Sequence, residues 1–394
     1  VFFSGMIKVG GSLYHVDTGN HIIRKTDLAL ETDEIFVGAF GVPGDDNTNV
    51  KVGTYDPGNS AGTINPHFRN PTGIAYYNGK LYLSDTGNHA IRIIDIASKA
   101  VSTLAGNAGL AGNAEGPSTS AFFSYPTGIV ANDINGDIYV SDTGNHLIKK
   151  ISAGIVSTVL GTGEAFNNSN YETDVLKLKS FALNTPLQLS YDSKKSDLYI
   201  NDFANKRILK MEAGGVVQKI TVKDSFYGGI QMHEDALAKR YVLIQDLINA
   251  EIIQLATSDL SISPVVNQGS FSGLIESDYV YNNFIKNNDD FLVAGIKNAN
   301  NSSALIKLQA STASAVIWYG DGGTLGQTKV WDEKAQVFSD FIDIFGKTLI
   351  TEMKTRINPT NTNADKRELL LKYFNKHEST DSSIEEKYSI MLGK

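Results

Sequence analysis

The hydrophobic pattern of this 394-residue chain alternates between short apolar runs and polar breaks. Within residues 127–161 the runs "TGIVAN", "IYVSD", "HLIKKIS" and "IVSTVLG" are rich in β-branched residues and partly alternate in polarity, which is typical of strands. The breaks between the runs carry Gly, Asn and Asp, and the pair Asn135–Gly136 favours a tight hairpin turn. This stretch therefore predicts four short strands joined by turns.

The same pattern returns along the chain, with a nearly constant joint between its second and third strands. The joint reads "VDTGNHIIRK" at 16–25, "SDTGNHAIRI" at 84–93 and "SDTGNHLIKK" at 141–150. Asp202 and Asp246 occupy the slot of its aspartate in later copies, and Gly295 occupies that slot in a degraded sixth copy. Units of about 45 residues with four strands each indicate a β-propeller, whose blades bury their faces against one another.

We interpret the joint as a structural turn rather than as a site. Asp85 is expected to accept hydrogen bonds from the backbone N–H groups of Thr86 and Gly87, and Gly87 permits positive φ. Asn88 is expected to bind the backbone next to it. The residues predicted to build these joints are Asp17, Gly19, Asn20, Asp85, Gly87, Asn88, Asp142, Gly144, Asn145, Asp202 and Asn205.

The motif "DTGNHxI[RK]" resembles the core of the NHL repeat, and residues 102–151 are similar to a complete NHL unit of bacterial extracytoplasmic proteins. The resemblance covers roughly residues 1–320. It implies an all-β propeller of six four-stranded blades, with seven blades as the alternative because residues 338–353 read like the start of another unit. It leaves the function open, since the family includes enzymes, RNA binders and modules that bind proteins or glycans.

The sequence predicts three regions. Residues 1–320 form the propeller, residues 321–357 add strands or a partial blade, and residues 358–394 form a linker followed by an amphipathic helical tail. The apolar positions expected on that tail are Leu370, Phe374, Tyr388 and Met391.

Composition excludes several classes of site and partner. The chain is 41% hydrophobic and 20% charged, with a formal net charge of −8, so it reads as globular and is not expected to bind nucleic acid. It has no cysteine, which excludes disulfides and thiolate metal sites. It also has no run of about 18 apolar residues, so no transmembrane segment is predicted.

The resemblance also raises the amidating lyases, in which histidines near the propeller axis hold a metal. His21, His89 and His146 occupy one slot in three successive blades, but sheets about 10 Å apart would not bring them to one ion. They are predicted to be polar caps at the start of a strand. The polar residues of the expected innermost strands form no recognisable acid–base set, and they are Lys8, Gln188, Gln231 and His233. We therefore predict no catalytic residue, no metal and no cofactor.

Two crossovers between consecutive blades are much longer than the motif requires. They cover residues 42–69 and 163–184, and we expect Phe68 and Phe181 to anchor them under the blades. The partner-binding residues predicted on them are Tyr55, His67, Arg69, Phe166 and Tyr171. The short joints are expected on the face opposite to these crossovers, and that face would offer a partner few side chains to bind.

These features predict a non-enzymatic binding or scaffold propeller of a cell-surface or extracellular assembly. Its long inter-blade loops would recognise protein or carbohydrate, and it would be a component of a larger complex. The alternative is a propeller enzyme of the lyase or lactonase type with an axial metal.

Overall fold

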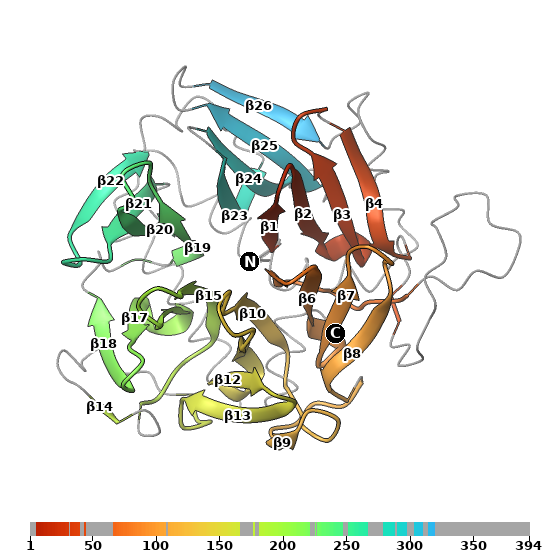
Figure 1. Ribbon diagram of the computed structural model, residues 1–394, viewed down its shortest axis with the longest axis vertical. Coiled ribbons are helices and arrows are strands. Elements are labelled where there is room, and N and C mark those ends of the chain that lie inside the picture. The colour runs from red at the N-terminus through yellow and green to blue at the C-terminus, as the bar shows by residue number, and fades with distance from the viewer. Residues whose placement is uncertain are drawn as a thin grey trace, which may run out of the picture.

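The strands form six antiparallel sheets arranged in a ring (Figure 1). In each sheet the four main strands follow one another in sequence order from the centre of the ring to its rim. The computed structural model describes residues 5–30, 32–39, 43–44, 66–107, 109–165, 176–177, 181–220, 225, 227–246, 251–266, 279–287, 290–297, 303–309 and 314–319.

Each sheet is one blade, and the blades are numbered in chain order. Blade 1 contains β1 (Met6–Val9), β2 (Ser12–Asp17), β3 (Ile22–Asp27) and β4 (Thr32–Gly38). Blade 2 contains β5 (Ile74–Tyr77), β6 (Lys80–Asp85), β7 (Ala90–Asp95) and β8 (Val101–Gly106). Blade 3 contains β10 (Pro126–Ala131), β11 (Ile138–Asp142), β12 (Leu147–Ser152) and β13 (Ile155–Leu160).

The other three blades follow the same plan. Blade 4 contains β15 (Pro186–Asp192), β16 (Asp197–Asp202), β17 (Arg207–Met211) and β18 (Val216–Ile220). Blade 5 contains β19 (Tyr227–Glu234), β20 (Arg240–Asp246), β21 (Glu251–Ala256) and β22 (Ile262–Val266). Blade 6 contains β23 (Tyr279–Asn287), β24 (Asp290–Lys297), β25 (Ser303–Gln309) and β26 (Ser314–Tyr319).

The local sequence explains why each blade forms. The four strands predicted within residues 127–161 are confirmed by β10 to β13, and the all-β prediction is confirmed in the described part of the chain. The turn between β5 and β6 has positive φ at both Asn78 and Gly79, which matches the twist of antiparallel strands.

The innermost strands bring the blades together around the axis. β1, β5, β10, β15, β19 and β23 each contact the next, and β23 contacts β1 (Figure 1). A small core cluster joins Leu13 of β2 to Ile285 and Leu292 of blade 6. The first and sixth sheets are therefore packed against each other, as neighbouring blades are.

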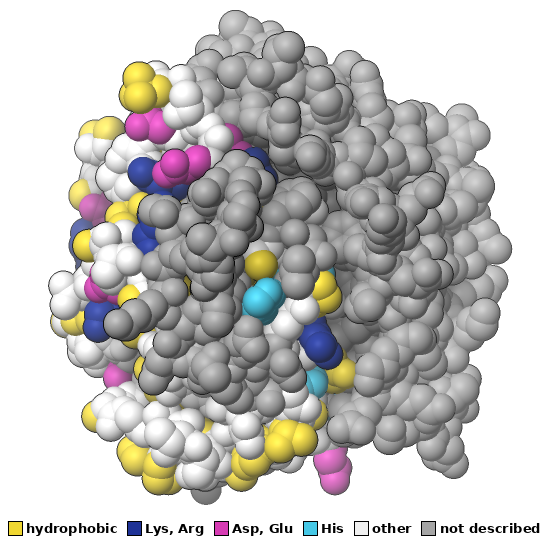
Figure 2. All heavy atoms as spheres, turned by 90° about the vertical axis from the view of Figure 1, so that its right-hand side faces the viewer, with side chains coloured by type: hydrophobic (Ala, Val, Ile, Leu, Met, Phe, Trp, Pro, Cys, Tyr) yellow, Lys and Arg dark blue, Asp and Glu magenta, His cyan; other side chains and the backbone are white. Residues whose placement is uncertain are grey.

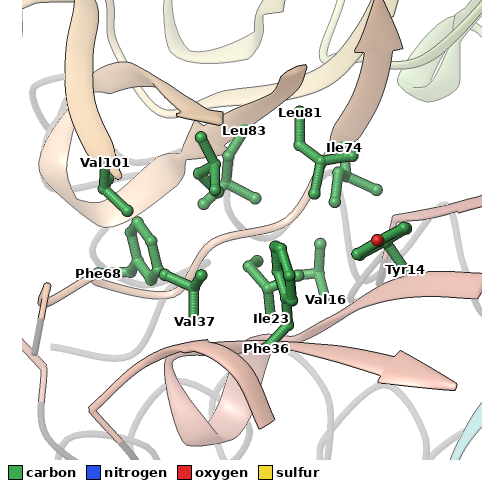
Figure 3. Close-up of a cluster of buried hydrophobic side chains, with 11 residues drawn as sticks. Tyr14, Val16, Ile23, Phe36, Val37, Phe68, Ile74, Leu81, Leu83 and Val101 are labelled. Atoms are coloured by element: carbon green, nitrogen blue, oxygen red, sulfur yellow. The ribbon is translucent and has the colours of Figure 1, made fainter. Parts of the chain in front are cut away.

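The main hydrophobic cores lie between blades. Between blades 1 and 2, side chains from β2, β3 and β4 face those from β5, β6 and β8, and the ring of Phe68 fills the outer part (Figure 3). Similar clusters separate blades 2 and 3, 3 and 4, and 4 and 5. Each fully buried aliphatic side chain contributes about 1.5–3 kcal/mol, so the ring is held together mainly at these interfaces.

Two crossovers add a short fifth strand to the rim. β9 (Gly116–Pro117) pairs with β13, and β14 (Leu176–Lys177) pairs with β18. Both belong to the crossover that leads into the blade they cover. They satisfy part of an edge that would otherwise expose unpaired backbone groups.

The joints and the crossovers lie on the same face of the ring, so the predicted opposition of these features is wrong. In an antiparallel pair the end of the second strand lies beside the start of the first, where the crossover arrives. The register shows this directly, because Pro126 at the start of β10 pairs with Asp142 at the end of β11. We call this the crossover face. The opposite face carries the hairpin turns, including Asn78–Gly79, and we call it the turn face.

Some predictions fall outside the described residues. These are the partial blade at 321–357 and the linker and helical tail at 358–394. In the ranges that the structure does describe, no helix is long and apolar enough to cross a membrane.

Candidate functional site

Each joint of the first four blades is a single 3-10 turn. These turns are η1 (Thr18–Asn20), η2 (Thr86–Asn88), η3 (Thr143–Asn145) and η5 (Phe203–Asn205). The residue that follows each turn has a left-handed backbone, and these residues are His21, His89, His146 and Lys206. The positive φ that Gly87 permits is therefore found two residues later, at His89. A side chain is excluded at Gly87 for another reason, since a Cβ there would lie 2.6 Å from Cγ of Arg69 and 2.9 Å from its carbonyl oxygen.

The joint aspartate is a buried acceptor for three donors. Asp85 Oδ1 accepts the backbone N–H of Arg69, at the end of the incoming crossover, at 2.7 Å. Its Oδ2 accepts Asn88 Nδ2 and Arg92 Nε, each at 2.9 Å. The predicted Asx-turn is wrong, because Asp85 makes no capping hydrogen bond to η2. Both carboxylate oxygens already hold the crossover and two side chains of the joint.

The same geometry recurs in the next two blades. Asp142 Oδ1 accepts the backbone N–H of Ser124 at 2.7 Å. Its Oδ2 accepts Asn145 Nδ2 at 2.7 Å and Lys149 Nζ at 2.8 Å. In blade 4 the carboxylate of Asp202 accepts Asn184 N, Asn205 Nδ2 and Arg207 Nε at 2.7, 2.8 and 2.7 Å.

These carboxyl groups are completely buried, and burial raises the pKa of Asp85, Asp142 and Asp202. The neighbouring cation and the N–H donors offset part of that rise. Removing one partner of such a buried arrangement is costly, because it leaves a buried charge without compensation.

The joint asparagine holds a second point of the crossover. Asn88 Nδ2 donates to the carbonyl oxygen of Gly44 at 2.6 Å, and Asn145 Nδ2 donates to that of Gly112 at 2.7 Å. The predicted bond to the asparagine's own neighbouring backbone is replaced by these longer connections. The joint is therefore a clamp that fixes a crossover at two separate places.

The joint histidines connect one blade to the next. Nδ1 of His21 accepts the backbone N–H of Asn70 at 3.1 Å, and Nδ1 of His89 and His146 accepts those of Tyr125 and Thr185 at the same distance. Burial, with a smaller effect of Arg69, lowers the pKa of His21 to about 3. The ring must be neutral at Nδ1 to accept this bond.

A threonine network and two glycines complete the contact near the axis. Thr86 Oγ1 donates to the carbonyl oxygen of Pro126 in the next blade at 2.7 Å and lies 2.7 Å from Thr72 Oγ1. A Cβ at Gly73 would lie 2.1 Å from the carbonyl oxygen of Thr127, and one at Gly128 would lie 2.0 Å from that of Leu187. The "PTGI" sequence is therefore required by the close approach of adjacent innermost strands.

Aromatic residues anchor the ends of the crossovers. Phe68 is fully buried and Phe181 is 5% exposed, which confirms that both are anchors. Phe123 is equally buried in the crossover between blades 2 and 3. The cations of the clamp lie over two of these rings, with Lys149 Nζ 5.1 Å from the centroid of Phe123 and Arg207 Cζ 4.6 Å from that of Phe181.

Two of the predicted partner-binding residues lie next to this framework. Arg69 is exposed and His67 is half-buried, on either side of the buried Phe68. The structure thus holds their backbone in place while part of each side chain reaches solvent. Tyr55, Phe166 and Tyr171 lie outside the described residues.

The histidines that could have served catalysis or metal binding do not meet at one point. The three joint histidines each bind a different crossover end, and His233 lies at the other end of the axis from them. Among the described residues, no group of three His, Asp or Glu side chains is placed to hold a metal ion.

Sequence reasoning missed the clamp because its two halves are far apart in sequence. Asp85 and Arg69 are separated by a strand pair, and Asn88 and Gly44 by more than forty residues. The available signal was the pattern "F-x-N-P" ahead of β5 and "F-x-Y-P" ahead of β10, which marks the anchor and the positions that the joint holds.

The ring of radial four-stranded sheets, with one clamp between the second and third strands, defines a repeat-built β-propeller. The family model described as "NHL repeat" matches residues 68–94 and 123–151. Both ranges begin at an anchoring phenylalanine and end in the third strand. The chain therefore carries NHL repeats in these two ranges, within a β-propeller fold.

Two curated proteins are similar to part of this chain. The chain is 31% identical over 156 residues to Protein SUPPRESSOR OF QUENCHING 1, chloroplastic, of Arabidopsis thaliana, a match that covers 38% of this chain and 14% of that protein. It is 38% identical over 89 residues to NHL repeat-containing protein 2 of Gallus gallus, which covers 22% of this chain and 12% of that protein. The chain therefore spans a small part of the curated relatives it matches.

Solved structures with a similar fold have low sequence identity to this chain. A streptogramin B lyase structure is 11% identical, with a TM-score of 0.47, and the alignment covers 80% of this chain and 81% of that one. A nidogen/laminin complex is 13% identical, with a TM-score of 0.45, covering 66% of this chain and 77% of that one.

Proposed function

We propose that this protein is a non-enzymatic binding propeller that recognises a protein or a carbohydrate through the long crossovers on its crossover face. The observation that carries the proposal is the clamp. The crossover into blade 2 is fixed at Gly44 by Asn88 and at Arg69 by Asp85. A loop held at both ends on a rigid scaffold can present side chains without a large ordering cost.

The residues that would make contact are those predicted from the sequence. His67 and Arg69 lie at the fixed end of one crossover, and Tyr55, Phe166 and Tyr171 are proposed on the intervening segments. Aromatic side chains with a polar rim suit both protein interfaces and stacking on sugars.

Charges of both signs are mixed on one side of the described surface. Figure 2 shows the side of the molecule that carries β4 and β8, where the described acidic and basic side chains are interspersed. A partner would therefore be selected by the local chemistry of the crossovers, and nucleic acid remains an unfavoured partner for a chain of net charge −8.

We further propose that the six sheets are the complete ring, with residues 321–357 and 358–394 as additions to it. The contact of β23 with β1 supports this, because a seventh blade would have to separate them. The setting we propose is a cell-surface or extracellular assembly, in which the propeller is one component of a larger complex. The alternative enzyme of lyase or lactonase type loses its initial motivation, since the joint histidines bind backbone N–H groups.

Two shortened variants test the binding proposal. One replaces residues 46–64 with a short Gly/Ser connector and keeps Gly44 and Phe68, and the other replaces residues 166–175 and keeps β14. Both should melt close to the parent chain, since loop length acts weakly on stability. Partners captured by the parent chain from its source, and a panel of defined glycans, are then titrated with all three proteins.

We expect at least one shortened variant to lose about tenfold or more in affinity, equal to about 1.4 kcal/mol. Chemical cross-links from the bound partner should also map to residues 42–69 or 163–184. Unchanged affinity of both variants, with cross-links confined to the turn face, would refute the proposal.

A further inference from the structure

A second polar feature lies at the opposite end of the axis, where β19 and β23 approach the turn face. Lys286 Nζ lies 3.2 Å from His233 Nε2, and the backbone N–H of Lys286 donates to Gln231 Oε1 at 3.1 Å. All three residues are half-buried. Blades 5 and 6 are thus joined at this point by polar groups rather than by an apolar core.

The ammonium group of Lys286 has no carboxylate partner within ion-pair distance among the described residues. Its side-chain contact is an imidazole, and burial followed by the charge of Lys286 lowers the pKa of His233. At neutral pH this makes the imidazole an acceptor without charge. A partly desolvated ammonium that faces a neutral group lacks the counter-charge that such groups normally have.

The two carboxylates that follow His233 in the chain, whose side chains the structure describes, are already engaged elsewhere. Glu234 follows His233 on the strand, so its side chain points to the other side, where it binds Lys194 at 2.7 Å and lies 3.4 Å from Arg240. Asp235 accepts the backbone N–H groups of Leu237 and Lys239, both at 2.9 Å. These acids cannot neutralise Lys286 without leaving their own partners.

The position of a second cation, Lys8, extends the feature around the axis. Lys8, His233 and Lys286 are each the next-to-last residue of an innermost strand, in the consecutive blades 1, 5 and 6. The pairing registers are equivalent, because each precedes the last strand pair before the hairpin turn. β1 and β19 both contact β23, so these three strands are neighbours around the axis (Figure 1).

We propose that Lys286 and His233 form an anion-binding site at the turn-face end of the propeller axis, which takes one carboxylate or phosphate group of a small ligand. One oxygen of the anion would accept from Lys286 Nζ, which has donors beyond its contact to the imidazole. Lys8 would add long-range attraction. The site is separate from the crossover face, so its test does not depend on whether the proposed function is correct.

The test uses the full chain and two probes, inorganic phosphate and glucuronate, at constant ionic strength with chloride as the reference. The imidazole resonances of His233, assigned with His233→Gln, are followed during titration at neutral pH. We expect saturable shifts with a dissociation constant on the order of 1 mM, because one charge-assisted contact provides little affinity. Tighter binding of phosphate would assign a phosphate ligand, and tighter binding of glucuronate a carboxylate ligand.

Two comparisons decide whether the binding is local. Lys286→Met should weaken binding by about tenfold, equal to about 1.4 kcal/mol, whereas Lys194→Met, which removes an exposed ammonium from the same face, should leave it unchanged. On the unaltered chain, a saturating probe should raise the pKa of His233 relative to chloride, which needs no variant to fold. An unchanged pKa, non-saturating shifts, or equal binding by Lys286→Met would overturn the proposal.

Discussion

At the scale of single residues, the polar side chains of the joint motif are explained by their hydrogen bonds to groups that are distant in sequence. Each of its polar side chains binds a group brought from elsewhere: the aspartate and asparagine hold the crossover, and the histidine holds the next blade. His21 shows the consequence most clearly, because its neutral Nδ1 is a required acceptor for Asn70. Protonation of Nδ1 would place its N–H group against the backbone N–H of Asn70, so the hydrogen bond would be lost.

Acid should therefore weaken the contact of blade 1 with blade 2. The pKa of His21 is lowered from 6.5 to about 3 on folding, so between these values the unfolded chain binds the proton and the folded chain does not. Stability is lost as pH falls through this window, by at most about 1.4 kcal/mol per pH unit. Urea unfolding from pH 7 to pH 4 measures this slope.

His21→Asn is the matched variant for this prediction. Asn offers an acceptor oxygen, tolerates the left-handed backbone of this position and does not titrate. It should lose less stability than the parent chain between pH 6.5 and pH 4. Parallel pH profiles of the two proteins would show that His21 does not control the acid response.

Glycine at the axis gives a second prediction at this scale. In Gly128→Ala the new Cβ would lie 2.0 Å from the carbonyl oxygen of Leu187, and backbone atoms must move to accept it. We expect a loss of about 1–3 kcal/mol in the free energy of unfolding. Gly214→Ala is the control, because no atom lies within 4 Å of that Cβ, and its change should stay within about 0.5 kcal/mol. Equal effects of the two changes would contradict the close-packing account.

At the scale of elements, the sequence determines the strands well and their surroundings poorly. Alternating apolar runs and the Asn–Gly turns predicted β10 to β13, because these depend on neighbouring residues. The placement of the joints on the opposite face from the crossovers was wrong, although antiparallel pairing alone brings the end of β11 beside the start of β10. The clamp could not be predicted, since its partners come together only when the ring forms.

The interface between blades 4 and 5 shows how an element compensates for a degraded joint. The joint of blade 4 has Lys206 in the position of the histidine, and ion pairs link blades 4 and 5 on the turn face. Arg240 at the start of β20 pairs with Asp192 at the end of β15, and both side chains are largely buried, with exposures of 14% and 0%. Lys194 pairs with Glu234 at the surface, with exposures of 61% and 37%.

These two pairs should differ strongly in their contribution. Arg240→Met leaves the buried carboxylate of Asp192 without its cation, which should cost about 3–5 kcal/mol. Lys194→Met should change the free energy of unfolding by less than about 1 kcal/mol, because Lys194 and Glu234 are both hydrated in the folded protein. Denaturant melts of the two variants measure the difference. A small effect of Arg240→Met would show that water solvates Asp192.

At the scale of the whole molecule, the blades are similar enough to stack but not identical in how they are joined. Histidine and threonine bonds connect blades 1 to 4 on the crossover face, and ion pairs connect blades 4 and 5 on the turn face. The clamps hold the crossovers on this ring. The central claim is that the repeated aspartate is a structural clamp of the crossovers and not a binding site.

Amide hydrogen exchange of Asp142→Ala tests this claim most directly. The change removes the acceptor for the backbone N–H of Ser124, and it leaves the buried ammonium of Lys149 without its carboxylate. We predict a loss of about 3–5 kcal/mol in stability and faster exchange at residues 121–125, at the end of the crossover into blade 3, with smaller changes in blade 6. Unchanged protection at Ser124 together with an unchanged melting temperature would contradict the account.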